Sequence, residues 1–183
     1  MAGSPGMNAF QALLDAAGNR RLPPVHAWHP ERVGDIDIRI AADGRWFHEG
    51  AEIRRERLVA LFSTVLRLDH DGHCLVTPAE KLRIVVEDAP FLAIDMESDG
   101  AGPARRLIFT TNVGDHVLAD AAHPIEVEER VGEPRPYVTV RDGLRARLTR
   151  SVFYRLVELG APAGEELEVW SAGSRFVLGL IEP

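Results

Sequence analysis

Apolar and polar residues alternate along many short stretches of this chain, and helical spacing is confined to a few segments. Ile36, Ile38 and Ile40 alternate with charged residues, which is typical of a half-buried β-strand. From residue 55 to 66, apolar residues instead recur every three or four positions, which predicts an amphipathic helix. The face of this helix that we expect to be buried consists of Leu58, Leu61, Phe62 and Val65.

The same reasoning, applied along the whole chain, predicts many short strands and three short helices. The expected helices span 8–17, 55–66 and 152–159. The expected strands span 36–40, 46–48, 71–76, 82–86, 91–96, 107–111, 116–119, 125–127 and 176–181, and a further strand begins at residue 137. Because strands and helices do not alternate regularly, the pattern favours a mostly antiparallel α+β fold over a doubly wound parallel sheet.

The order of the expected elements repeats along the chain. A strand, an Asp-Gly turn, a second strand and a short helix run from residue 37 to 68, and the same order returns in shorter form from 137 to 159. This repetition predicts a duplicated, β-rich core with short helices. Our alignment of the two copies pairs Ile53 with Leu148, Arg55 with Arg150, Leu58 with Phe153 and Leu61 with Leu156.

Turn-forming residues suggest where the chain divides. Residues 20–34 contain three prolines and no clear periodicity, so we expect an N-terminal helix and a connector over 1–34. The segment 132–136 is rich in glycine and proline and is therefore the expected boundary between two halves. The expected halves are a first β-rich half over 35–131 and a second half, containing the repeat copy, over 132–183.

Charge and composition limit the classes of partner. The chain has 21 lysines and arginines against 28 aspartates and glutamates, a net charge of −7, which argues against generic binding to nucleic acid or to anionic membranes. Its single cysteine excludes an intramolecular disulfide. The apolar stretch 58–66 is much shorter than the roughly 20 residues that cross a bilayer, and the first residues do not resemble a secretory signal. We therefore expect a cytoplasmic protein.

The familiar catalytic and cofactor motifs are missing from the sequence. It contains no Gly-rich dinucleotide fingerprint, no phosphate-binding GxxxxGK[ST] loop, no GxSxG elbow, no HExxH and no CxxC pair. We therefore assign no catalytic residue, no metal ligand and no cofactor, and expect a binding protein rather than an enzyme. The segment 69–74 does hold two aspartates, two histidines and a cysteine, but its Asp-Gly pair is also a plain hairpin turn.

Arginines gather where two of the expected helices begin. Helix N-termini attract anions through free N–H groups, and the guanidinium fork of arginine suits phosphate or carboxylate. The two groups could line one cleft for a small anion. In the second group, Arg145 and Arg147 could instead solvate a strand face or pair with nearby glutamates. The first group consists of Arg54, Arg55 and Arg57, and the second of Arg145, Arg147 and Arg150.

Several stretches together resemble a bacterial family known only as domain of unknown function 1285. They occur in order and cover most of residues 28–157. The resembling stretches are Gly34–Ile40, Asp43-Gly44-x-Trp46, Ile53-Arg54-Arg55, Leu61-Phe62, Thr77-Pro78-x-Glu80-Lys81, Val86–Phe91, Thr111–Asp115 and Arg141–Arg150.

This resemblance implies a duplicated β-rich core whose second half is superficially similar to pleckstrin-homology-like domains. It also implies a ligand site where the halves meet and a role in signalling or regulation, without an established activity. The polar positions that match the family are Arg55, Thr77, Glu80, Lys81, Asn112, Asp115 and Arg150.

We therefore predict a non-enzymatic protein that binds a small anionic, nucleotide-like ligand between its halves. Arg55, Lys81 and Arg150 would supply charge, and Arg147 joins them from the arginine argument above. Two alternatives stay open: a small metal-dependent or hydrolytic enzyme that uses the histidines, and an adaptor that recognises another protein. We expect no membrane partner.

Overall fold

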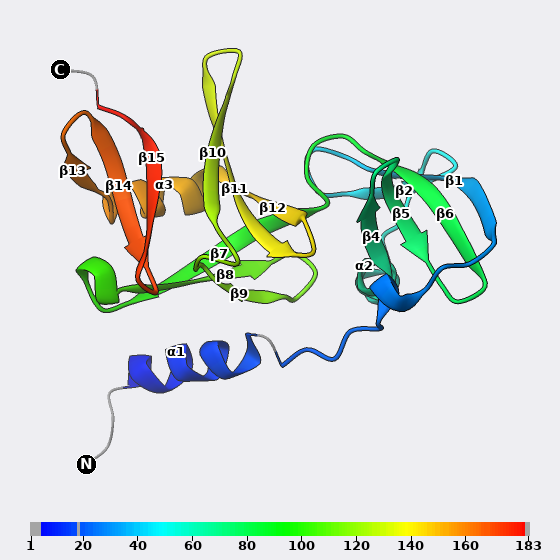
Figure 1. Ribbon diagram of the computed structural model, residues 1–183, viewed down its shortest axis with the longest axis horizontal. Helices are drawn as coiled ribbons and strands as arrows, with labels where there is room; N and C mark the ends of the chain where they lie inside the picture. Colours follow the sequence, from blue (N-terminus) through cyan, green and yellow to red (C-terminus); the bar gives the residue numbers. More distant parts are fainter. Residues whose placement is uncertain (1–4, 18, 182–183) are drawn as a thin grey trace.

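The computed structural model describes residues 5–17 and 19–181 of the chain, so part of the expected N-terminal segment 1–34 lies outside the described residues. Short helices connect or flank three β-sheets (Figure 1). The helices are α1 (Pro5–Ala16), η1 (Val25–Ala27), α2 (Glu56–Thr64), η2 (Gly102–Ala104) and α3 (Arg150–Glu158). Within the described residues, no helix has the length and apolar character needed to cross a membrane.

In the described residues, fifteen strands form five antiparallel, three-stranded meanders. The first two meanders are β1 (Arg32–Ile40), β2 (Trp46–His48) and β3 (Ala51–Glu52), then β4 (Leu66–Asp69), β5 (Gly72–Val76) and β6 (Glu80–Val86). The next two are β7 (Phe91–Asp99), β8 (Arg106–Thr111) and β9 (His116–Leu118), then β10 (Ile125–Arg130), β11 (Glu133–Arg141) and β12 (Leu144–Leu148). The last is β13 (Ala161–Ala163), β14 (Glu166–Ser171) and β15 (Ser174–Leu180).

Meanders combine into sheets in the same way each time. The first sheet has the order β3-β2-β1-β6-β5-β4, and the second has the order β10-β11-β12-β7-β8-β9. In each sheet one parallel pair, β1 with β6 or β12 with β7, joins two antiparallel meanders. The remaining meander forms a third sheet, whose β15 lies beside β10. The predicted fold class, a mostly antiparallel and duplicated α+β core, is therefore confirmed.

The two longer helices align in a different register from the one that the sequence suggested. Each longer helix connects two meanders: α2 lies between β3 and β4, and α3 between β12 and β13. Since α2 begins at Glu56 and α3 at Arg150, Arg150 corresponds to Glu56 and not to Arg55.

Burial along the two helices shows the same shift of one residue. Leu61, one of the four residues expected on the buried face, is 60% exposed, whereas Phe62, also expected there, does pack against the core. Its counterpart in α3 is the fully buried Leu156. The shift matters because each residue turns a helix by about 100°.

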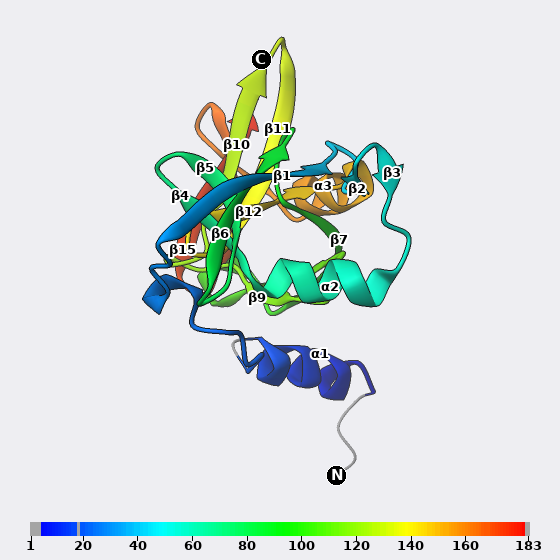
Figure 2. The same ribbon diagram turned by 90° about the vertical axis from the view of Figure 1, so that its right-hand side faces the viewer.

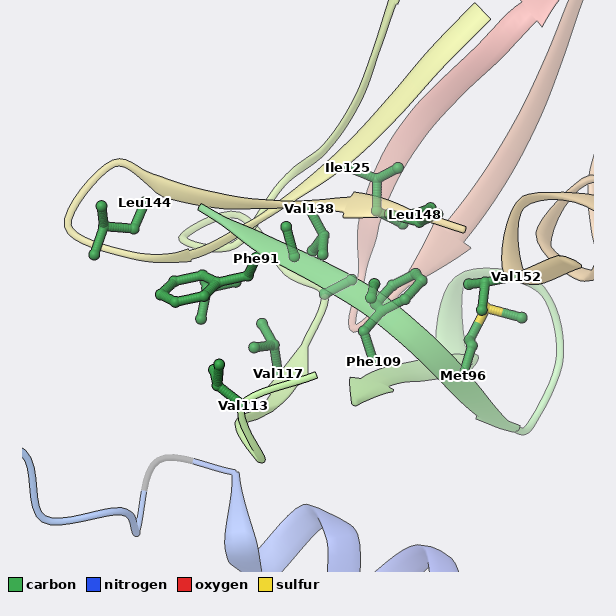
Figure 3. Close-up of a cluster of buried hydrophobic side chains, with 14 of the residues drawn as sticks. Phe91, Met96, Phe109, Val113, Val117, Ile125, Val138, Leu144, Leu148 and Val152 are labelled. Carbon is green, nitrogen blue, oxygen red and sulfur yellow. The ribbon is translucent and has the colours of Figure 1, made fainter. Parts of the chain in front are cut away.

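One hydrophobic core extends through both six-stranded sheets. It contains Ile40 and Trp46 of the first sheet together with Phe91 and Phe109 of the second. Figure 3 shows part of this core beside the strands of the second sheet. Because the two sheets share a core, the elements at their junction are held in fixed positions.

The chain passes from the first sheet to the second between β6 and β7, at residues 87–90. The division expected at residue 132 falls instead in the turn of the β10–β11 hairpin, where Arg130 pairs with Glu133. Gly132 has a φ of +74°, so its glycine belongs to a tight turn and not to a linker. Prolines are tolerated at 134 and 136 because β12 pairs with β11 only from Tyr137 onward, which leaves that edge free. The predicted halves, 35–131 and 132–183, therefore do not coincide with the two six-stranded sheets, and the division into these halves stays a prediction.

Candidate functional site

Lys81 of β6 lies in an ion-pair cluster within the first sheet. Its Nζ is 2.7 Å from Asp69 Oδ2 and 2.8 Å from Asp71 Oδ1. These hydrogen bonds raise the pKa of Lys81. The pKa of Asp69 is lowered by its hydrogen bonds to Arg67 and to Lys81. Arg67 also donates to the carbonyls of Val25 and Trp28, so the cluster holds the N-terminal connector against the sheet. Lys81 therefore has a structural partner set and lines none of the cavities described below.

Thr77 and Glu80 shape the turn between β5 and β6. Thr77 Oγ1 accepts hydrogen bonds from the N–H groups of Ala79 and Glu80, at 3.3 and 3.2 Å. The Glu80 carboxylate is 3.5 Å from the exposed Arg32. Both predicted ligand residues thus have local partners in the turn.

Asp115, which follows β8, joins three parts of the molecule. Its buried carboxylate accepts hydrogen bonds from Arg20 of the connector and from Arg141 of β11, the latter at 2.6 Å. Arg141 also donates to the carbonyl oxygen of Ser63 in the last turn of α2, at 2.7 Å. Asp115 and His116 line a cavity of about 460 Å³ against α1, which lies below the second sheet in Figures 1 and 2.

Arg147 and Arg150 lie together at the beginning of α3. They line a small cavity of about 190 Å³, which we call the α3 pocket. Arg147 is 3.2 Å from Asp88, and the neighbouring Arg145 bonds to Glu128 at 2.5 Å. For Arg145 the alternative interpretation, pairing with a nearby glutamate, is therefore correct.

Arg55 is the exposed residue immediately before α2, and it lines none of the four cavities. The structure thus brings Arg147 and Arg150 together but leaves Arg55 and Lys81 elsewhere. The single shared cleft expected for these charges is wrong in its geometry. Whether any of the predicted residues binds a ligand stays a prediction.

A larger cavity lies between α2 and the turn that joins β8 to β9. We call this cavity, of about 560 Å³, the α2 pocket. Only one of its residues, Asn112, is among the predicted ligand residues. The lining residues are Gly44, Arg45, Trp46, Glu52, Ile53, Arg54, Glu56, Arg57, Val59, Ala60, Asn112 and Val113.

The turn between β1 and β2 packs closely against the second sheet at this pocket. Asn112 Oδ1 accepts a hydrogen bond from the N–H of Leu92 at 2.9 Å, which fixes the Asn112 side chain. Gly44 has a φ of +86°, and a Cβ at this position would lie 2.8 Å from Leu92 Cδ1 and 3.2 Å from Asn112 Nδ2. Glycine is required here both for its backbone conformation and for this close approach.

Two donors in the α2 pocket lack an acceptor. Trp46 is 1% exposed and stacks on Phe62 with ring centroids 6.2 Å apart, and its Nε1 has no hydrogen-bond partner in the described part of the chain. Arg45 pairs with Asp43 at 2.8 Å, and Arg54 lies 3.5 Å from Glu52. Arg57 has no ion pair with any described residue. A buried donor without an acceptor costs about 1–3 kcal/mol, which applies to Trp46 Nε1, whereas Arg57 is exposed and its guanidinium group is free to bind an anion.

Comparison with known proteins identifies the family. The N-terminal domain model of the domain of unknown function 1285 (DUF1285) matches residues 23–89, and the C-terminal domain model of this family matches residues 90–178. The chain belongs to the DUF1285 family. Its structure is similar to the crystal structure of a DUF1285 family protein from Silicibacter pomeroyi DSS-3, with 42% identity and a TM-score of 0.85, over 98% of this chain and 97% of that chain.

A second solved DUF1285 protein, from Shewanella baltica OS155, is 28% identical with a TM-score of 0.53, over 67% of this chain and 91% of that chain. No match was found among curated proteins. The two DUF1285 domain models meet between residues 89 and 90, where the chain crosses from the first sheet to the second. The α2 pocket is therefore lined by residues from both DUF1285 domains.

The sequence reasoning missed Arg45 and Trp46 and ranked Arg55 above Arg54 and Arg57. The motif Asp43-Gly44-x-Trp46 was the available signal, because a glycine fixed in a turn beside a tryptophan marks a close approach.

The side chains of the metal-competent segment 69–74 have other partners or are buried. Asp69 and Asp71 bind Lys81, and burial raises the pKa of the Cys74 thiol to about 11. Among the described residues, no group of three or more metal-competent side chains comes together. The enzyme and adaptor alternatives stay untested predictions.

Proposed function

We propose that this DUF1285 protein binds a small anionic, nucleotide-like ligand in the α2 pocket and serves a regulatory role without catalysing a reaction. The observation that carries the proposal is that Trp46, whose Nε1 has no acceptor in the described part of the chain, and Arg57, which has no ion pair there, line one pocket. A ligand with an anionic group for Arg57 and a second hydrogen-bond acceptor for Trp46 Nε1 would provide both donors with partners.

The position of α2 supports an anion. The helix begins at Glu56, and within the described residues no side chain caps its first turn. The N–H groups of a first helical turn have no intrahelical acceptor and attract negative charge. Glu52 and Glu56 also line the pocket, and they would accept hydrogen bonds from hydroxyl or amino groups of the same ligand. A phosphorylated molecule with sugar hydroxyls has both kinds of group.

Size and location agree with this ligand class. A volume of about 560 Å³ lies within the range of roughly 300–1,000 Å³ that is usual for small-molecule sites. One wall comes from the first sheet and α2, and the other from the turn at Asn112 in the second sheet. A ligand bound there would contact both DUF1285 domains, which supports a regulatory role.

Calorimetric titration with AMP, ATP and inorganic phosphate tests the proposal. We expect the wild-type protein to bind a nucleotide, and Arg57→Ala to weaken its affinity by at least about tenfold, because a hydrogen bond to a charged group contributes about 1.5–3 kcal/mol. Arg32→Ala is the matched control, since Arg32 is an exposed arginine outside the pocket. Absence of binding by all three compounds, or equal affinities of wild type and Arg57→Ala, would contradict the proposal.

A further inference from the structure

The α3 pocket has the same local arrangement at the beginning of α3 as the α2 pocket has at the beginning of α2. Each pocket lies between the start of a meander's middle strand, the end of its last strand and the first half of the helix that follows. The two helices begin 150 − 56 = 94 residues apart. With that shift, the corresponding lining residues are Ile53 and Arg147, Arg54 and Leu148, Glu56 and Arg150, Val59 and Phe153, and Ala60 and Tyr154.

Positive charge is in excess beside the α3 pocket. Three guanidinium groups surround the single carboxylate of Asp88, whose side chain is 2% exposed. The nearest nitrogens of Arg147, Arg135 and Arg130 lie 3.2, 3.7 and 3.9 Å from its oxygens. One Asp88 oxygen also accepts the hydroxyl of Tyr137 at 2.6 Å. These distances exceed the 2.7–2.9 Å of a strong ion pair, so Asp88 pairs only weakly with each arginine. Arg130 has a second partner, Glu128, at 3.2 Å, whereas Arg135 and Arg147 have no other acidic partner among the described residues.

Two further donors near this cluster lack an acceptor. Arg135 Nε is buried and has no hydrogen-bond partner in the described ranges. Arg150 lines the pocket, is exposed, and forms no ion pair with the residues that the structure describes. Glu133 is the acidic residue among those lining the pocket, against the two arginines 147 and 150.

We propose that the α3 pocket is a second anion site, distinct from the α2 pocket, for one phosphoryl or carboxylate group attached to a small apolar or aromatic group. Arg147 and Arg150 hold the oxyanion, as guanidinium groups suit phosphate and carboxylate oxygens. Phe153, Tyr154 and Pro136 form the apolar wall beside it. With a volume of about 190 Å³, against about 560 Å³ for the α2 pocket, the site suits a ring with one anionic group better than a nucleotide.

Titration of the full chain with phenyl phosphate, benzoate and inorganic phosphate tests this assignment and separates the ligand sources. We expect phenyl phosphate to bind, Arg150→Ala to weaken it by at least about tenfold, and Arg150→Lys to restore part of the affinity. Arg150 is exposed and has no ion-pair partner to lose among the described residues, so its substitution leaves the fold intact.

Arg32→Ala, which removes an exposed arginine outside both pockets, is the matched control and should leave phenyl phosphate binding unchanged. Binding that is lost in Arg57→Ala but kept in Arg150→Ala would assign the ligand to the α2 pocket and overturn the second site. Absence of binding by all three compounds, or equal affinity of wild type and Arg150→Ala, would overturn it as well. Failure of the nucleotide titration leaves this result unaffected, because that test depends on AMP, ATP and Arg57→Ala, whereas the second site depends on phenyl phosphate and Arg150→Ala.

Discussion

Replacing Asp115 with asparagine should destabilise the protein markedly, because its carboxylate neutralises two arginines in a buried place. The Asp115 side chain is 7% exposed, and that of Arg141 is 15% exposed. Breaking a buried ion pair by removing one partner costs about 3–5 kcal/mol. Asparagine keeps one acceptor oxygen and Arg20 is 31% exposed, so we expect a smaller loss, of about 2–3 kcal/mol. At about 2–4 °C per kcal/mol for a domain of this size, the melting temperature should fall by about 4–12 °C.

Urea unfolding followed by circular dichroism measures this loss, and Asp95→Asn provides the matched control. Asp95 also accepts a hydrogen bond from an arginine, Arg155, at 2.7 Å, but its side chain is 52% exposed. Exposed pairs contribute about 0–1 kcal/mol, so Asp95→Asn should change stability little. A loss at Asp115 no greater than the loss at Asp95 would refute the structural role argued here.

Three further results are expected. Gly44→Ala should destabilise the protein by at least about 1 kcal/mol more than Gly132→Ala, because both glycines have positive φ but only a Cβ at 44 meets a neighbour, and equal losses in urea unfolding would contradict this. The pKa of Asp69 is lowered by its hydrogen bonds to Arg67 and Lys81, so its contribution to stability is present above its ordinary pKa of 3.8 and is lost as pH falls. The free energy of unfolding should therefore drop more steeply below about pH 4 in wild type than in Asp69→Asn. Parallel curves for the two proteins would contradict this role of Asp69. Cys74 is buried with a thiol pKa raised to about 11, so a disulfide reagent at pH 8 should label it only after unfolding, whereas fast labelling of the native protein would show that the thiol is accessible.

Period-two and helical patterns were sufficient to predict most elements of the fold. Residues 46–48 form the expected strand, and the expected strand at 36–40 is the end of β1. The patterns failed where the same residues fit two different structures equally well. Leu61 and Phe62 are adjacent and both apolar, so the sequence could not show which one faces the core. Likewise, Gly132 and the prolines after it are typical of a linker, and only strand pairing shows that they form a hairpin with a free edge.

The site was less predictable than the fold because it depends on contacts distant in sequence. Charged residues alone do not show which partner they meet: Lys81 has Asp69 and Asp71, whereas Arg57 has no acidic partner among the described residues. The sequence directed attention to the beginning of the first helix, but a shift of one residue decides which arginines line the pocket. The contribution of Trp46 depends on an acceptor that its surroundings do not supply, which no sequence pattern indicates.

The indole N–H resonance of Trp46, followed by ¹H–¹⁵N NMR during titration with AMP, tests the proposed α2-pocket site most directly. Substitution of each tryptophan by phenylalanine assigns the three indole signals. The account predicts a saturable shift of the Trp46 signal as its Nε1–H gains an acceptor, while the Trp170 signal stays in place because Trp170 Nε1 already donates to Glu168 at 3.1 Å. Two results would contradict the claim that the α2 pocket holds the ligand. In the first, AMP saturates the protein but the Trp46 signal stays fixed. In the second, AMP does not bind and the Trp46 signal stays fixed throughout the titration.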